Sequence, residues 1–284
     1  MHGPPLRVGL VQLRSGRRQG PNIDIACGLI REAAASGAQL IATPEMTHMI
    51  EAESAVLLDT ARPEAEDPGF SAFSSLAAEL SVTLLVGSLA IRRTDGRIAN
   101  RSFLFGPDGA CLAHYDKIHM FDVDLPGGES YRESRHYEAG TRAVLARLPG
   151  SGTLLGLTIC YDLRFPALYR ALAQAGAQII AVPAAFTRTT GEAHWHVLLR
   201  ARAIETGCFV IAPAQGGRTE VGRETFGHSL VVSPWGQVVA EAGTDPTVII
   251  ADLDLAQVAE ARGKIPALTL DRPFTLERAG EGPA

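Results

Sequence analysis

Short runs that are apolar at almost every position recur along the chain, and they alternate with longer segments whose apolar residues repeat at helical spacing. Continuous apolar runs are typical of strands that are covered on both faces of a sheet. We therefore predict buried strands at residues 6–13, 40–43, 83–89, 153–159, 179–182 and 208–213. The helical spacing predicts helices at residues 22–36, 70–80, 166–175 and 194–205. Strands that alternate with helices indicate an α/β fold.

Two pairs of apolar runs are joined by turn residues instead of a helix. The sequence GPDG at 106–109 separates one pair, and SPWG at 233–236 separates the other. Such turns predict β-hairpins, so the sheets should be mixed. Because no linker or shift in composition marks a boundary, we predict one domain over residues 1–277 and a C-terminal tail over residues 278–284.

The composition narrows the class of protein. Hydrophobic residues make up 46% of the 284 positions and charged residues 20%, and no segment reaches the roughly 18 continuous apolar residues of a membrane span. The net charge of -5 provides no basic surface for nucleic acid or anionic lipid. We therefore expect no nucleic-acid or membrane partner, and a small molecule or another protein instead.

The four cysteines are widely separated. They form neither CxxC pairs nor a dense disulfide framework, and the N-terminus lacks the basic and apolar regions of a secretory signal. Both features predict a reducing compartment, the cytoplasm. Cys27, Cys111 and Cys208 lie within apolar segments, where we expect them to be core residues.

Common cofactor motifs are missing from the sequence. It has no HExxH, and His194 and His196 stand two apart on a predicted helix, where they point in different directions. It also has no phosphate-binding GxxxxGK[ST], no GxGxxG after the first strand and no GxSxG. We therefore expect no metal, no nucleotide cofactor and no serine nucleophile.

Cys160 has the position of a nucleophile. It ends a predicted strand and precedes the run YDLRFP and a helix. Strand ends open into crevices of α/β folds, and a following helix turn favours both a thiolate and an oxyanion. A buried core cysteine is the alternative. The polar residues directly after Cys160 argue against it, since they have no packing purpose in an apolar core.

A thiol near its ordinary pKa is only a few per cent thiolate at neutral pH, so Cys160 needs an activating partner. Glu45 directly follows the predicted strand at 40–43, and Lys117 directly follows the second strand of the first hairpin. Taken alone, Glu45 and Lys117 would each be interpreted as a charged surface residue. Because all three residues stand at ends of core strands, they can meet at one rim.

In their order and local context, Glu45, Lys117 and Cys160 resemble the Glu-Lys-Cys triad of the nitrilase, or carbon–nitrogen hydrolase, superfamily. The resemblance extends from about residue 6 to residue 271. Within the family, the chain is most similar to the branch of deaminated glutathione amidases and omega-amidases. The motifs that carry this similarity lie at residues 115–124, 160–166, 191–195, 200–205 and 227–229.

The resemblance implies a four-layer αββα sandwich with two mixed sheets, and a catalytic mechanism. Glu45 would act as the general base, and Cys160 would attack the carbon of a primary amide to form a thioester. The Lys117 ammonium and the backbone N–H of Tyr161 would hold the oxyanion. A second glutamate of the family matches Glu133, which would orient Lys117 or the amide nitrogen.

The substrate implied by the resemblance is a linear amide of a small carboxylic acid, of the deaminated glutathione type. An omega-amidase acting on alpha-ketoglutaramate or succinamate is the alternative, and an acyltransferase or a non-catalytic binding protein is more remote. Arg164 either receives a substrate carboxylate or pairs with Asp162 or a helix terminus. We expect four further residues to line or cover the pocket: Met120, Phe121, Phe186 and Thr187.

The family also implies a homodimer or a higher even oligomer. The helix at residues 166–174 presents Leu168 and Leu172 on one face with Tyr169 beside them, and the helix at 194–205 presents Leu198. We expect these helices to meet their symmetry mates across a twofold axis.

Overall fold

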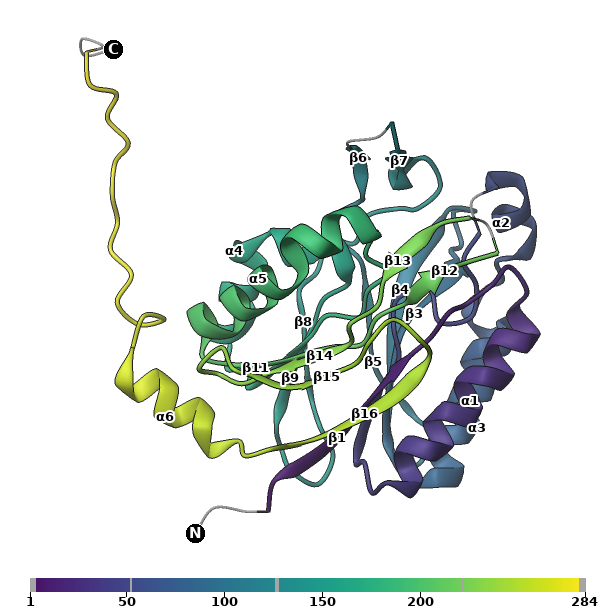
Figure 1. The fold of residues 1–284 in the computed structure, drawn as a ribbon, viewed down its shortest axis with the longest axis horizontal. Helices are drawn as coiled ribbons and strands as arrows, with labels where there is room; N and C mark the ends of the chain where they lie inside the picture. Colours follow the sequence, from purple (N-terminus) through teal and green to yellow (C-terminus); the bar gives the residue numbers. More distant parts are fainter. Residues whose placement is uncertain (1–3, 52, 126–127, 221, 281–284) are drawn as a thin grey trace.

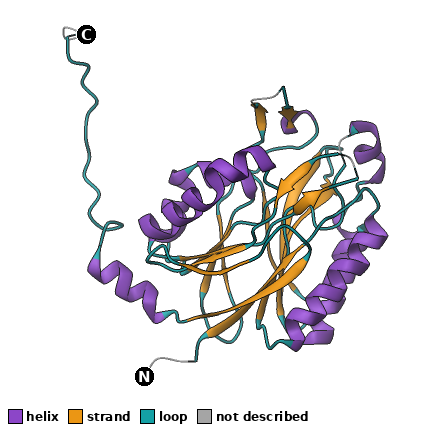
Figure 2. Ribbon diagram, in the orientation of Figure 1, coloured by secondary structure: helices purple, strands orange, loops and turns teal. Residues whose placement is uncertain are grey.

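The computed structural model describes residues 4–51, 53–125, 128–220 and 222–280. Two six-stranded mixed sheets pack face to face, and helices cover the outer face of each sheet (Figures 1 and 2). This arrangement is the predicted αββα sandwich. It follows from strands that are apolar on both faces, because each sheet must bury one face against the other sheet and one against helices.

The first sheet has the strand order β16-β1-β2-β3-β4-β5. Its central strands β1, β2 and β3 run parallel, and the remaining pairs are antiparallel. Helices α1 (Gln19–Ala35) and α3 (Pro68–Leu80) cover its outer face (Figure 1). The strands are β1 (Leu6–Gln12), β2 (Leu40–Ala42), β3 (Thr83–Arg92), β4 (Ile98–Phe105), β5 (Cys111–Asp116) and β16 (Thr247–Leu253).

The second sheet has the order β15-β14-β11-β10-β9-β8. Here β9, β10 and β11 are the parallel strands. Helices α4 (Pro166–Gln174) and α5 (Arg188–Thr206) cover its outer face (Figure 1). The strands are β8 (Val144–Arg147), β9 (Leu154–Leu157), β10 (Ile179–Ala181), β11 (Phe209–Ala212), β14 (Leu230–Val232) and β15 (Val238–Glu241).

Gly87 marks a place where the two sheets come very close. A Cβ atom there would lie 2.1 Å from the backbone oxygen of Thr43 and 2.5 Å from the side chain of Pro183. Only glycine allows this approach. It brings the ends of β2 and β10 together, and these ends lead into the cavity described below.

The six predicted strands, the four predicted helices and both hairpins are confirmed, with shifts at their ends. The largest shift is in α5, which begins at Arg188, six residues before the predicted start. Several elements were not predicted, most of them very short. They are β6 (Asp122–Asp124), β7 (Ser130–Arg132), β8, β12 (Gly216–Arg218), β13 (Glu224–Phe226), β16, α2 (Ser54–Thr60), α6 (Ala256–Lys264) and the 3-10 helices η1 (Glu64–Glu66), η2 (Glu133–Arg135) and η3 (Cys160–Arg164).

Two predictions about side chains were wrong. Leu168, Tyr169 and Leu172 do not form an outer face of α4, because all three are buried in the core between α4 and its own sheet. Cys111 is exposed, since β5 is the edge strand of the first sheet. By contrast, Cys208 is buried as expected.

After α6 the chain leaves the body of the molecule. Its described residues, as far as Gly280, form no further helix or strand, and they extend away from the sandwich (Figure 1). No helix in the described ranges combines the length and the apolar character that crossing a bilayer would require.

Candidate active site

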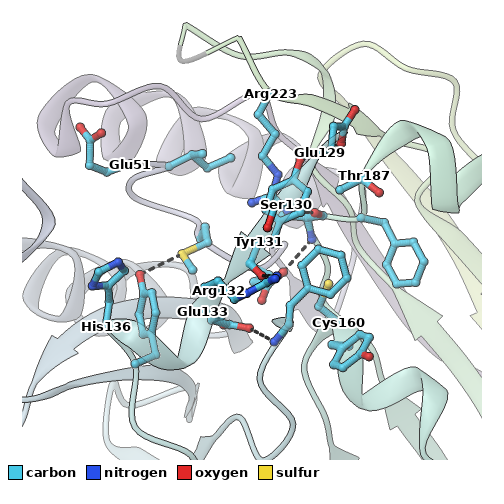
Figure 3. A pocket seen from close by; sticks show the side chains of 18 of the residues that line it. Glu51, Glu129, Ser130, Tyr131, Arg132, Glu133, His136, Cys160, Thr187 and Arg223 are labelled. Atoms are coloured by element: carbon cyan, nitrogen blue, oxygen red, sulfur yellow. Dashed lines mark hydrogen bonds between the residues drawn. The ribbon is translucent and has the colours of Figure 1, made fainter. Parts of the chain in front are cut away.

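A cavity of about 940 Å³ opens where loops from both sheets meet (Figure 3). Its wall includes Glu45, Lys117, Glu133 and Cys160, so the four residues proposed from sequence to take part in the chemistry share one site. They come from four separate stretches of the chain, which the fold assembles.

Cys160 begins a short 3-10 helix, η3 (Cys160–Arg164), shortly after β9. Its backbone has a φ of 48°, in the left-handed region, and its N–H donates to the carbonyl oxygen of Pro183 at 2.9 Å. The residue is 7% exposed. This sharp turn presents the thiol to the cavity while the neighbouring strands remain in the sheet.

Glu45 and Lys117 form a buried ion pair beside the thiol. Lys117 Nζ lies 2.9 Å from Glu45 Oε1, and the backbone N–H of Ala185 donates to Glu45 Oε2 at 2.9 Å. Glu45 and Cys160 both line the cavity, and the Glu45 carboxylate is near enough to raise the pKa of the thiol. Glu45 therefore acts on both the nucleophile and the cation.

Glu133 is the second carboxylate on Lys117. Its two oxygens lie 3.0 and 2.8 Å from Lys117 Nζ, and Oε2 also accepts a hydrogen bond from the backbone N–H of Phe121 at 2.7 Å. Lys117 thus forms ion pairs with both Glu45 and Glu133.

Asn100 is a site residue that the sequence analysis missed. Its side-chain amide donates to Glu45 Oε1 at 2.9 Å and to Glu133 Oε1 at 3.0 Å. Asn100 lies within β4 in the polar run Asn100-Arg101-Ser102, so the sequence pattern does not distinguish it from a surface position. With Lys117, it fixes the separation of the two carboxylates.

The protonation states follow from these contacts. Burial raises the pKa of the Cys160 thiol well above its usual value, and the Glu45 carboxylate raises it further. Burial opposes ionisation of Glu45, yet the Lys117 ammonium lowers the pKa of this carboxyl below its usual value. Burial also opposes the charge of Lys117, but Glu133 and Glu45 raise the pKa of the amine well above its usual value. At neutral pH the site therefore holds a thiol, a carboxylate and an ammonium.

A buried aspartate braces the two loops that carry Lys117 and Cys160. Asp162 Oδ2 accepts hydrogen bonds from the Tyr115 hydroxyl at 2.7 Å and from the backbone N–H of Ile159 at 2.9 Å. Asp162 Oδ1 accepts one from the backbone N–H of His119 at 3.0 Å. Because Asp162 already has these partners, it makes no ion pair with Arg164 among the described residues.

The residues expected to bind substrate divide into two groups. Those that line the cavity are Tyr161, Phe121, Phe186 and Thr187. Met120 and Arg164 do not. Met120 packs beside an apolar cluster around Met49, whereas the Arg164 guanidinium lies 3.3 Å from His194 Nδ1 and over the rings of Tyr161 and Phe186.

Arg223 is a second residue that sequence analysis missed. It lines the cavity beside Tyr131, with its guanidinium carbon 5.3 Å from the centre of that ring (Figure 3). One terminal nitrogen donates to the carbonyl oxygen of Ala185 at 2.6 Å, while Nε is buried without an acceptor in the described part of the chain. Arg223 is a cation whose hydrogen-bonding capacity is not used up.

Within the described residues, the cavity wall contains no cluster of side chains with metal-ligand spacing. The single cluster of that kind is formed by His196, His228 and Glu241, none of which lines the cavity.

A cysteine, a glutamate and a lysine in one cavity of an αββα sandwich match the site that the resemblance to carbon–nitrogen hydrolases predicts. In agreement, residues 7–263 match the family model described as carbon-nitrogen hydrolase. The chain belongs to this family.

Similar proteins include amidases. The chain is 37% identical over 273 residues to the omega-amidase NIT2 of Bos taurus, covering 95% of this chain and 96% of that protein. It is 38% identical over 266 residues to a deaminated glutathione amidase of Synechocystis sp., covering 93% and 97%. Its fold matches the crystal structure of the C. elegans NitFhit protein with a TM-score of 0.88 and 32% identity, covering 96% of this chain and 66% of that one.

Proposed function

We propose that the protein is a cysteine-dependent amidase that hydrolyses a linear primary amide of a small carboxylic acid, of the deaminated glutathione type, to a carboxylate and ammonia. The convergence of Cys160, Glu45 and Lys117 in one cavity carries this proposal. The similarity to amidases of both kinds supports it.

Acylation begins from a thiol, because the pKa of Cys160 is raised. Glu45 accepts the thiol proton as the sulfur attacks the amide carbon, so charge does not build up on the buried sulfur. The carbonyl π electrons move to oxygen, which becomes the oxyanion of a tetrahedral intermediate. Glu45 then gives its proton to the leaving nitrogen, ammonia departs, and a thioester remains on Cys160.

Two donors are placed to stabilise the oxyanion. Lys117 carries its positive charge beside Cys160, and Tyr161 lies in the first turn of η3, where backbone N–H groups lack intrahelical acceptors. In deacylation Glu45 removes a proton from water, which attacks the thioester carbon, and the proton returns to the departing sulfur. We assign Glu133 a positioning role, since both of its oxygens bind the Lys117 ammonium.

We further propose that Arg223 binds the carboxylate of the substrate. The unused Nε of Arg223 faces a buried environment, and a carboxylate would supply the acceptor that it lacks. None of the described residues forms an ion pair with Arg223, so its charge is available to a ligand. Arg164, by contrast, does not line the cavity: its guanidinium contacts His194 and packs against the rings of Tyr161 and Phe186, two residues of the cavity wall.

The assembly we propose is a homodimer. Apolar side chains are exposed on α5 and on the adjacent β14–β15 turn, at Val197 (68% exposed), Ile204 (55%) and Trp235 (53%). Phe274, in the extended C-terminal segment, is 91% exposed. Clustered apolar exposure of this kind is typical of an interaction surface. A second copy of the chain would cover it.

We also propose a cytoplasmic location and a single domain over residues 1–277 with a tail at 278–284. The four cysteines, all of them free thiols, support a reducing compartment. The described part of the tail follows a segment that already lacks regular structure.

Ammonia release from a panel of substrates tests the proposed function. The panel contains carboxylate-bearing amides, neutral amides of equal length and nitriles, each with and without an added amine acceptor. We expect ammonia from the carboxylate-bearing amides. Acyl transfer to the amine would instead favour an acyltransferase. The absence of any reaction with the whole panel would favour a non-catalytic binding protein. Deaminated glutathione and alpha-ketoglutaramate, compared directly, separate the two amidase specificities.

The nucleophile is tested with a matched pair of variants. Cys160→Ala should abolish ammonia release and leave the fold intact, because it removes one sulfur from a cavity wall. Cys208→Ala, at a fully buried position, should lower the free energy of unfolding by about 1–2 kcal/mol and leave turnover unchanged. The reverse result would show that the nucleophile was misassigned.

A further inference from the structure

Three metal-ligating side chains converge at a place that the amide chemistry does not use. His196 lies on α5, His228 lies between β13 and β14, and Glu241 is the last residue of β15. His196 Nε2 is 2.8 Å and His228 Nδ1 is 2.9 Å from the same oxygen, Glu241 Oε1. The three potential ligand atoms lie within 4.8 Å of one another. We propose that these residues form a binding site for a transition-metal dication such as Zn²⁺.

The donor set fits this class of ion. Two imidazole nitrogens and one carboxylate oxygen match the sets that bind Zn²⁺ with an open position for water, and imidazole is a preferred ligand of such metals. Mg²⁺ and Ca²⁺ prefer oxygen ligands throughout, so the two imidazoles disfavour them. The single carboxylate also leaves a net positive charge on the ion, which favours a bound water or anion.

The two imidazole rings are held in place before any ion binds. The backbone of His228 is in the left-handed region, with a φ of 53°, and its N–H donates to the carbonyl oxygen of Gly243 at 2.8 Å. The indole N–H of Trp195 donates to the carbonyl oxygen of His228 at 2.8 Å. Phe226 stacks on the His228 ring at 4.4 Å and meets the His196 ring edge-on at 5.9 Å. This order lowers the entropic cost of binding an ion.

Without an ion, Glu241 Oε1 accepts a hydrogen bond from each ring. Binding replaces these two hydrogen bonds with coordinate bonds at about 2.0–2.2 Å. Each neutral ring then carries its proton on the other nitrogen, Nδ1 in His196 and Nε2 in His228. Since an imidazole nitrogen that carries a proton offers no lone pair to a metal, protons compete with the ion and the affinity should be lower in acid.

An ion at this place would join three elements that are distant in the sequence. Helix α5 would be linked to the start of β14 and to the end of β15, so the ion would stabilise the packing of α5 on the second sheet. Any ligand that binds the folded chain and not the unfolded one raises the melting temperature. The expected effect of zinc is therefore on stability.

Zinc binding to the Cys160→Ala variant tests the proposal, because the thiol beside Glu45 is removed as a competing ligand. Zn²⁺ is titrated by calorimetry into chelator-treated protein at pH 7.5 and 5.5, with Mg²⁺ in a parallel titration, and the melting temperature is measured with and without zinc. We expect one Zn²⁺ per chain at pH 7.5, a higher melting temperature, weaker binding at pH 5.5 and no binding of Mg²⁺.

Matched variants in the same background locate the ion. His196→Ala and Glu241→Gln should each weaken zinc binding by at least about tenfold, with melting temperatures close to the parent in the absence of zinc. His194→Ala removes a neighbouring histidine of α5 that contacts Arg164 instead, and should leave zinc binding unchanged. Undiminished binding in both His196→Ala and Glu241→Gln, or no binding by the parent, would overturn the proposal.

Discussion

The side-chain amide of Asn100 donates a 2.9 Å hydrogen bond to Oε1 of Glu45, the same oxygen that lies 2.9 Å from Lys117 Nζ. The general base is therefore oriented by a residue that touches neither the nucleophile nor, in the mechanism proposed, the substrate. Asn100 also donates to Glu133, so one amide holds both carboxylates.

Replacing Asn100 should slow the reaction without unfolding the chain. In Asn100→Ala, Glu45 loses one of its donors and can rotate away from the thiol, so kcat should fall by roughly tenfold to a hundredfold. Asn100→Asp places a third carboxylate beside Glu45 and Glu133 and should be worse. Steady-state kinetics together with melting curves check this. Equal kcat values in the parent and in Asn100→Ala would show that Asn100 is not needed to orient Glu45.

Glu45→Gln retains the shape of the side chain but cannot accept the thiol proton. The rate should fall by roughly 10² to 10⁴-fold, and both acylation and deacylation should be slower. Intact-mass spectrometry after mixing with substrate should therefore show little accumulated thioester. Full accumulation of the thioester would mean that another group takes the proton during acylation.

Arg223→Gln should discriminate between substrates according to charge. A charge-assisted hydrogen bond contributes about 1.5–3 kcal/mol, so kcat/KM for a carboxylate-bearing amide should fall by roughly tenfold to a hundredfold. The value for a neutral amide of equal length should be nearly unchanged. Arg164→Gln is the matched control, and a selective loss in that variant instead would transfer the role to Arg164.

The pH dependence should lack a transition near neutrality. The pKa of Glu45 lies below its ordinary value of 4.5, while the pKa values of Cys160 and Lys117 lie above their ordinary values of 9.0 and 10.5. We therefore expect kcat/KM to be flat between about pH 6 and pH 9. A midpoint near 6.5 in the kinetic profile would point to a histidine as the base.

Stability should depend on pH through the same ion pair. Ionised Glu45 stabilises the fold above pH 4.5, and this contribution is lost as the pH falls through its lowered pKa. The raised pKa of Lys117 contributes below pH 10.5 and is lost as the pH rises through that pKa. Urea unfolding at several pH values measures both limits.

Substitution of two exposed isoleucines tests the proposed dimer. Ile204→Asp on α5 should convert a species of twice 30.1 kDa into one of 30.1 kDa in light scattering, because it places a charge on the proposed interface. Ile25→Asp on α1 has a similar exposed starting residue, 53% against 55%, on the opposite side of the sandwich, and should leave the mass unchanged (Figure 1). A parent protein of 30.1 kDa would contradict the dimer.

The elements with a strong apolar pattern were predictable, and so was the meeting of the three groups that directly follow strands. Glu45 and Cys160 stand just past buried strands, and Lys117 directly follows the edge strand β5, so each has a simple interpretation as a polar residue at a strand end. Asn100 lies inside β4 instead, and its role depends on the carboxylates brought to it by other loops. Arg223 lies in a short stretch without any motif.

The outer face of a helix was harder to predict than its existence. The spacing of Leu168 and Leu172 shows that α4 has one apolar side, but the same spacing serves a core and an interface equally well. In the structure, both leucines pack in the core. Elements of three residues, such as β6 and β12, are too short to display any periodicity, so only the tertiary structure defines them.

The left-handed backbone of Cys160 places backbone strain at the same residue that supplies the nucleophile. A side chain in this region costs roughly 1–2 kcal/mol, which glycine would avoid. Replacing Cys160 with glycine would therefore relieve this strain and abolish the activity at the same time. Selection for thermal stability alone would favour glycine at position 160 and an inactive protein, whereas selection for activity retains the cysteine.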